Sequence, residues 1–88
     1  MPNPISKSEI ASYHAHVYFD TKDAVQMERA RCLHTWISER FLVQIGRLGT
    51  RPGGPHPLPM FEVAFDTVIF AELVPWLMMN HQGLSVLI

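Results

Sequence analysis

An alternating pattern near the N-terminus constrains the fold of this 88-residue chain more than any other feature. Between Ser12 and Phe19, apolar side chains alternate with two histidines, and alternation with a period of two is typical of a strand with one covered face. His14 and His16 then project to one side, and the apolar side chains between and after them project to the other. The sequence therefore predicts a strand that carries two imidazoles on one face.

The rest of the chain predicts two helices and three more strands. In chain order, the expected elements are a strand over 12–19, a helix to about residue 40, a strand over 41–48, a strand over 60–65, a helix from Asp66-Thr67 and a strand over 84–88. This β-α-β-β-α-β order is typical of the α+β, ferredoxin-like sandwich, an antiparallel four-stranded sheet with two helices on one face. Its usual strand order, 4-1-3-2, makes the first and third strands neighbours. Residues 1–11 are interpreted as an N-terminal arm and residues 12–88 as one domain.

Local signals predict where the helices begin, bend and end. Asp20-Thr21 is the expected N-cap of the first helix, with Asp23 in its first turn. Pro75 is expected to kink or split the second helix, and Gly83 to end it. The side chains predicted to face the sheet are Val25, Leu33, Trp36 and Ile37 in the first helix and Val68, Ile69, Leu73, Trp76 and Leu77 in the second.

Charge and cysteine content exclude several classes of protein. The net charge is −1, and the seven Lys and Arg residues form no run, so no nucleic-acid partner is expected. Cys32 is the single cysteine and has no partner for an internal disulfide, which favours a reducing, cytoplasmic location. The N-terminus does not resemble a signal peptide, and the nearly uncharged tract 67–88 is interrupted by Glu72, Pro75 and Gly83, so no membrane span is expected.

Alternation also divides the sheet into a covered face and an open face. The side chains assigned to the helix-covered face are Ala15, Val17, Phe19, Phe41, Val43, Ile45, Phe61, Val63, Phe65, Leu84, Val86 and Ile88. Those left for the open face are His14, His16, Tyr18, Gln44, Met60, Glu62, Ala64, Ser85 and Leu87. Because the first and third strands are neighbours in this fold, Glu62 is expected beside the two histidines.

Two histidines and one carboxylate are the ligand set typical of non-haem Fe(II) enzymes, in which further coordination positions stay open. His56, between two prolines in the Gly- and Pro-rich loop from Leu48 to Pro59, is a further candidate ligand or base. Arg47, at the edge of this loop, is a candidate partner for a substrate carboxylate. The alternative is that the open face is solvated or forms a dimer interface, with its histidines paired to backbone or carboxylate groups.

Four blocks of the sequence resemble, in the same order, the DOPA 4,5-dioxygenase family. They are Tyr13–Phe19, Gly54–Val63, Val74–Asn80 and Gly83–Ile88. The resemblance implies a ferredoxin-like homodimer that cleaves a catechol such as DOPA with O₂ in extradiol fashion. It also implies a bound metal, Fe(II) or another divalent ion such as Zn(II). A non-catalytic, dimeric, ferredoxin-like binding or interaction module is the alternative function.

The resemblance also selects site residues. The candidate metal ligands are His14, His16, His56 and Glu62, and the candidate catalytic residues are His56, His14 and Glu62; the motif does not settle which of them ligate and which transfer protons. From their places on the open face and beside the loop, Tyr18, Gln44 and Arg47 are the expected substrate-binding residues. Family members usually continue past the last strand with a His-Pro pair and then Thr-Gly and Asp-His segments, whereas this sequence stops at Ile88. A truncated chain with impaired activity is therefore expected if a missing histidine is a ligand.

Overall fold

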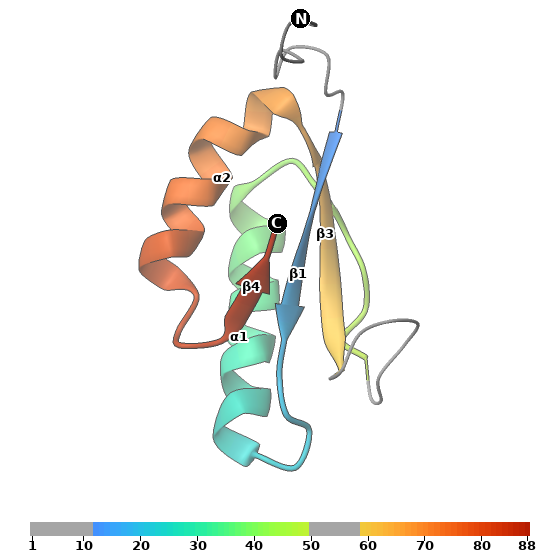
Figure 1. The fold of residues 1–88 in the computed structure, drawn as a ribbon, viewed down its shortest axis with the longest axis vertical. Coiled ribbons are helices and arrows are strands. Elements are labelled where there is room, and N and C mark those ends of the chain that lie inside the picture. Colours follow the sequence, from blue (N-terminus) through green and yellow to red (C-terminus); the bar gives the residue numbers. More distant parts are fainter. Residues whose placement is uncertain (1–11, 50–58) are drawn as a thin grey trace, which may run out of the picture.

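The computed structural model describes residues 12–49 and 59–88, and it confirms the predicted order of elements. The elements are β1 (Ser12–Tyr18), α1 (Ala24–Arg40), β2 (Gln44–Ile45), β3 (Met60–Asp66), α2 (Thr67–Asn80) and β4 (Ser85–Leu87). The strands form one antiparallel sheet in the order β2-β3-β1-β4, with both helices on one side of it (Figure 1). The fold is therefore the expected α+β, ferredoxin-like sandwich. The N-terminal arm 1–11 and most of the predicted loop, including His56, lie outside the described residues.

The pairing of β1 with β3 forms the centre of the sheet. Seven residue pairs run without a break from Ser12–Asp66 to Tyr18–Met60. The core fills the space between this pair of strands and the helices. Its buried members are Ala15, Val17, Phe19, Ala30, Leu33, Ile37, Phe61, Val63, Phe65, Leu73, Leu77 and Leu84. The predicted covered face of β1 and β3 is thus confirmed, and the predicted side chains of the second strand pack against its margin.

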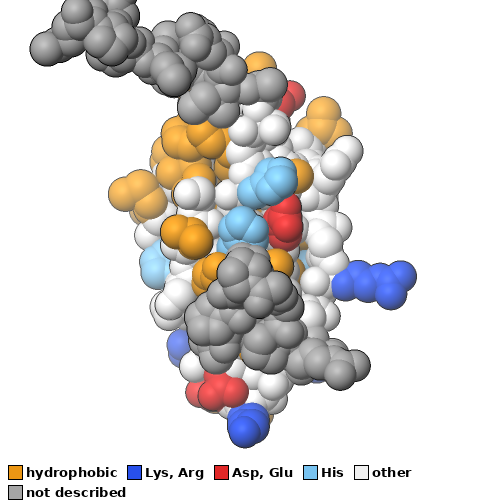
Figure 2. Space-filling view, turned by 45° about the vertical axis from the view of Figure 1, so that its right-hand side comes forward, with side chains coloured by type: hydrophobic (Ala, Val, Ile, Leu, Met, Phe, Trp, Pro, Cys, Tyr) orange, Lys and Arg blue, Asp and Glu red, His pale blue; other side chains and the backbone are white. Residues whose placement is uncertain are grey.

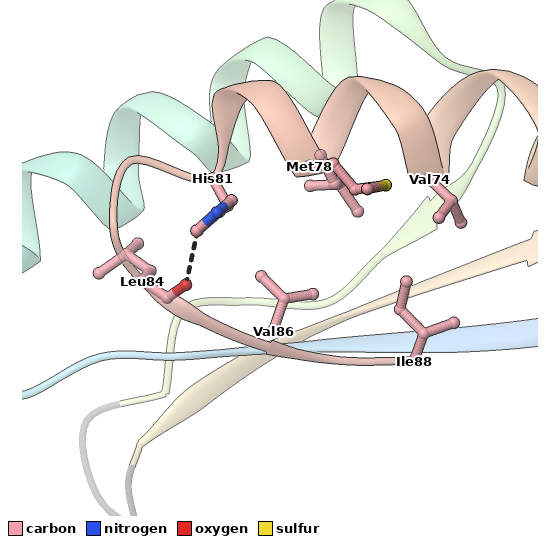
Figure 3. Close-up of a pocket in the computed structure, with 7 residues that line it drawn as sticks. Val74, Met78, His81, Leu84, Val86 and Ile88 are labelled. Atoms are coloured by element: carbon pink, nitrogen blue, oxygen red, sulfur yellow. Dashed lines mark hydrogen bonds between the residues drawn. The ribbon is translucent and has the colours of Figure 1, made fainter.

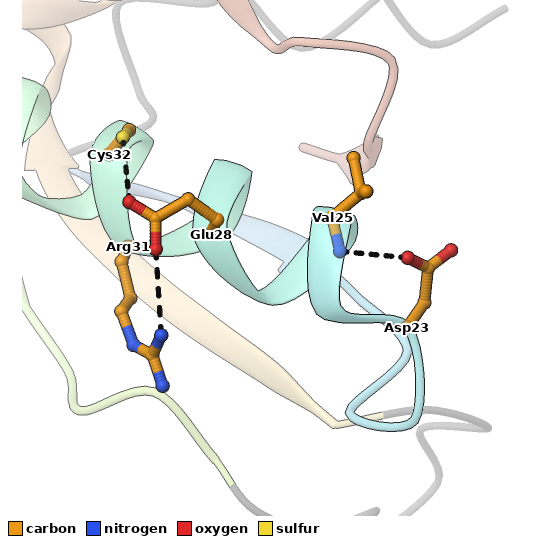
Figure 4. A network of polar contacts seen from close by, with 5 residues as sticks. All are labelled: Asp23, Val25, Glu28, Arg31 and Cys32. Atoms are coloured by element: carbon orange, nitrogen blue, oxygen red, sulfur yellow. Dashed lines mark hydrogen bonds and ion pairs between the residues drawn. The ribbon is translucent and has the colours of Figure 1, made fainter.

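The N-cap predicted for the first helix is wrong. The Asp23 carboxylate accepts a hydrogen bond from the Val25 backbone N–H at 3.0 Å (Figure 4). It also accepts one from the Gln26 N–H at 3.2 Å, so Asp23 is the cap. Asp20 instead forms a turn, in which its carbonyl accepts from the Asp23 N–H and its carboxylate from the Lys22 N–H. This turn moves the start of the helix to Ala24. The cap predicted for the second helix is confirmed, because the Asp66 carboxylate accepts from the Ile69 N–H.

Two side chains predicted to face the sheet point to solvent. Val25 is 56% exposed and Val68 is 79% exposed. Val25 lies five residues before buried Ala30, and Val68 lies five residues before buried Leu73. Five residues correspond to a rotation of about 140° around a helix. Each valine therefore lies far from the stripe that faces the sheet.

The helix α2 is not split at Pro75 but continues from Thr67 to Asn80. A proline in a helix deprives the carbonyl four residues earlier, here that of Ala71, of its backbone partner. Pro75 and Ala71 are both exposed, so water can satisfy that carbonyl and the helix tolerates the loss. The helix ends before the predicted Gly83: its last residue is Asn80 and its C-cap is His81. The two residues that follow, Gln82 and Gly83, have left-handed φ values of 57° and 76°.

The second strand is much shorter than the predicted 41–48. Only Gln44 and Ile45 pair with β3, opposite Ala64 and Val63. Beyond them, the Gly46 N–H donates to the Glu62 carbonyl and the Gly49 N–H to the Met60 carbonyl. The advance of three residues from Gly46 to Gly49 thus matches an advance of only two residues, from Glu62 to Met60, on β3. This mismatch ends the regular pairing of the two strands. Within the described ranges, neither helix is long and apolar enough to cross a membrane.

The capping assignment leads to a prediction for stability. We expect Asp23→Ala to lower the free energy of unfolding by about 1 kcal/mol, because two N–H groups of the first helical turn lose their acceptor. Asp23→Ser, which keeps an acceptor at the cap, should recover most of that loss in urea unfolding followed by circular dichroism. A larger loss in Asp20→Ala than in Asp23→Ala would contradict the assignment.

Candidate metal centre

The two central strands bring two histidines and a glutamate together on the open face. His16 lies directly opposite Glu62 in the β1–β3 ladder, and His14 lies opposite the next open-face residue, Ala64. The neighbours of Glu62 along its strand, Phe61 and Val63, are fully buried on the helix side. Alternation therefore holds the Glu62 carboxylate on the same face as both imidazoles. On the face seen in Figure 2, histidine side chains lie next to an acidic side chain.

The distances within this group differ in an informative way. His14 Nδ1 lies 2.7 Å from Glu62 Oε1, whereas His16 Nε2 lies 3.8 Å from Glu62 Oε2. The first separation is that of a hydrogen bond, with the ring N–H donating to the carboxylate. The second is too long for a hydrogen bond. It matches the spacing of roughly 3–4 Å between two ligand atoms that each lie about 2.1 Å from one ion.

Each of the three residues offers one ligand atom, and these atoms all lie within 4.8 Å of one another. No other group of three such side chains in the described ranges meets this condition. The His14 side chain is 54% exposed, that of Glu62 36% and that of His16 20%. The group is therefore anchored at His16 and open to solvent at His14, which leaves room for a further molecule.

Of the predicted substrate-binding residues, one lies beside this group. Tyr18 follows His16 on the same face of β1, and the two rings are stacked with centroids 6.5 Å apart and planes 29° apart. Gln44 shares the face but pairs with Ala64, which pairs with His14. It is thus two strand spacings, about 10 Å, from His14. Arg47 is exposed in the segment after β2, and His56 lies outside the described residues.

A residue that the sequence did not assign to the site supports it from the helix side. His34 on α1 donates from Nε2 to the Gly46 carbonyl at 2.8 Å, and its ring meets the edge of Phe61 at 5.2 Å. The Gly46 N–H in turn donates to the Glu62 carbonyl at 2.8 Å. His34 thus connects α1 to the backbone of the residue that provides the carboxylate. No sequence signal predicts this contact, because it joins a helix to an irregular segment twelve residues away.

Comparisons with known proteins agree with the fold. The model of the Dopa 4,5-dioxygenase family matches residues 13–88. A protein of Botryotinia fuckeliana named "Uncharacterized 21.2 kDa protein" is 34% identical over 87 residues, covering 97% of this chain and 48% of its own length. A "DOPA 4,5-dioxygenase" of Amanita muscaria is 30% identical over 87 residues, covering 92% of this chain and 38% of its own length.

A solved structure is also similar. The crystal structure of a "putative dioxygenase" from Nostoc punctiforme superposes with a TM-score of 0.86 at 43% sequence identity. The match covers 94% of this chain and 70% of the Nostoc chain. The present chain therefore spans less than half the length of the two fungal relatives and more than two thirds of the solved one.

The supporting role of His34 can be tested by stability. We expect His34→Ala to lower the free energy of unfolding by about 1 kcal/mol or more, because the Gly46 carbonyl loses its donor and the Phe61 ring loses a contact. His34→Gln, whose amide can donate to the same carbonyl, should be less harmful. His14→Ala, on the open face, is the matched control in urea unfolding. A greater loss from His14→Ala than from His34→Ala would contradict this assignment.

Proposed function

Since the chain belongs to the Dopa 4,5-dioxygenase family, we propose that it carries the metal centre of an extradiol dioxygenase, an enzyme that opens the ring of a catechol such as DOPA with O₂. The observation that carries the proposal is the convergence of His14, His16 and Glu62 on the open face of the sheet. The name of the Amanita muscaria relative supports the choice of substrate class. The activity of a complete enzyme is part of the proposal, because the chain spans only part of its relatives' length.

The residues present fit a divalent metal ion. Two imidazole nitrogens and one carboxylate oxygen form the donor set of the non-haem Fe(II) oxygenases, and the 3.8 Å gap between His16 and Glu62 suits two ligands of one ion. His14, His16 and Glu62 would hold Fe(II), or another divalent ion such as Zn(II). When bound, the metal supplies Lewis acidity and open positions for the two catechol oxygens and O₂.

The protein side chains can also hold a proton. In a neutral His14 whose Nδ1–H donates to the Glu62 carboxylate, Nε2 carries a lone pair. A catechol hydroxyl must lose a proton during ring cleavage, and this lone pair is a suitable acceptor. The negative charge of Glu62 at 2.7 Å would stabilise the resulting imidazolium. Metal ligation and proton acceptance are thus the two roles open to His14, and the part of His56 stays a prediction.

The expected homodimer and the cytoplasmic location also stay predictions. The alternative function, a non-catalytic ferredoxin-like module, shares the same fold and differs in what the open face does. In that case the His14–Glu62 contact is an ordinary surface ion pair. Metal binding and ring cleavage separate the two functions.

Metal binding is the first measurement. We expect protein purified without chelators to bind one Zn(II) per chain in calorimetric titrations, and His14→Ala and His16→Ala to weaken this binding by about 100-fold or more. The loss of groups that merely orient a ligand already costs about 10- to 100-fold. His34→Ala removes a histidine outside the group and should weaken Zn(II) binding less than either of these changes. Equal weakening in all three variants would contradict the metal site.

Ring cleavage is the second measurement. We expect the Fe(II)-loaded chain to consume O₂ and form a yellow, ring-opened product when catechol or DOPA is added under air. His16→Ala should lose this reaction, because the ion loses its least exposed ligand. A chain that binds metal tightly but neither consumes O₂ nor forms product with either compound would favour the non-catalytic module.

A further inference from the structure

The strand β4 contributes a side chain to the row that contains two of the candidate metal ligands. In the β1–β4 ladder, His16 pairs with Leu87, Val17 with Val86 and Tyr18 with Ser85. Since His16 also pairs with Glu62 on its other side, the row across the sheet is Glu62, His16, Leu87. Directly opposed side chains in an antiparallel pair have Cβ atoms about 4.5–5.5 Å apart. Leu87 is therefore a directly opposed cross-strand neighbour of His16, as Glu62 is on the other side.

The direction of Leu87 follows from its two neighbours. Val86 pairs with buried Val17, and it lines a groove of about 360 Å³ between α2 and β4. Ile88 lines the same groove, so both lie on the helix side of β4 (Figure 3). Alternation then directs Leu87 to the open face, where it is 57% exposed. The open face thus presents a large apolar side chain directly beside His16.

The surroundings of His16 are consequently asymmetric. The β3 side carries the Glu62 carboxylate, and the β4 side carries the isobutyl group of Leu87. A catechol has the same asymmetry, with two adjacent hydroxyl groups on one edge and an apolar ring behind them. An aromatic ring laid over Leu87 would remove apolar surface from water, which favours binding.

We propose that Leu87 is a specificity-determining residue of this site, an apolar wall against which the ring of a catechol packs while its hydroxyl groups reach the metal. This inference rests on the proposed function. It adds to it a residue that recognises the aromatic part of the substrate. Tyr18, stacked on His16 and paired with Ser85, lies next to the same wall.

The test compares two ligands that bind metal through two oxygens and differ in having a ring. The Zn(II)-loaded chain is titrated with 4-nitrocatechol, followed by its absorption spectrum, and with acetohydroxamate, which has no aromatic ring, followed by calorimetry. Leu87→Ala should weaken 4-nitrocatechol binding by about 10-fold, because three carbons of apolar contact are lost. It should leave the affinities for acetohydroxamate and Zn(II) unchanged. Leu87→Met, which keeps the apolar volume, should restore 4-nitrocatechol binding.

Ile88→Ala is the matched control, because Ile88 is a similarly exposed aliphatic residue on the same terminal segment, at 49%, and faces the other side of the sheet. It should bind both ligands as the unaltered chain does. Equal weakening of both ligands by Leu87→Ala, a loss of Zn(II) affinity, or an equal effect of Ile88→Ala would overturn the inference and leave the proposed function standing. An unaltered chain that binds no Zn(II) would overturn both.

Discussion

The pairing of β1 with β3 is the interaction on which the core and the candidate site both depend. Its seven-pair register decides which side chains of the two central strands meet the helices. A slip by one residue would exchange the two faces, moving His16 toward the helices and fully buried Val17 into water. The register that buries the apolar side chains is therefore also the one that brings His16 and Glu62 together. The free energy of core formation thus holds the polar group in place.

Much of the fold follows from local pattern. Alternation along β1 and β3 is a property of adjacent residues, so the sequence correctly predicts both faces of these strands, and the order of elements predicts the sheet topology. The errors concern features that depend on distant or competing contacts. The first helix begins later because Asp20 forms its own turn, and β2 has two residues because its pairing with β3 becomes irregular after Ile45. Neither outcome is contained in a local periodicity.

The candidate site shows the same division. Side-chain parity places His14 and His16 on one face, and the usual strand order of the fold adds Glu62. The sequence does not predict that the carboxylate contacts one imidazole at 2.7 Å and leaves 3.8 Å to the other, since these distances depend on side-chain rotamers. The role predicted for Gln44 shows what alternation along a strand cannot predict, namely the distance between strands. Its face is correct, but β2 lies beyond β3, which separates Gln44 from His14 by a whole strand. The His34–Gly46 contact depends on where β2 ends and has no local signal.

The strands around His16 differ in how firmly they are held, and the difference matches what each contributes. The candidate ligands lie on β1 and β3, which share seven residue pairs at the centre of the sheet. Leu87 lies on the edge strand β4, which has three pairs with β1. Metal ligands must be held within about 0.5 Å of the required geometry, whereas an apolar wall tolerates larger shifts because dispersion and hydrophobic contacts are not directional. The candidate ligands, which need accurate positions, thus lie on the two best-paired strands, and Leu87, whose position can vary more, lies on the edge strand.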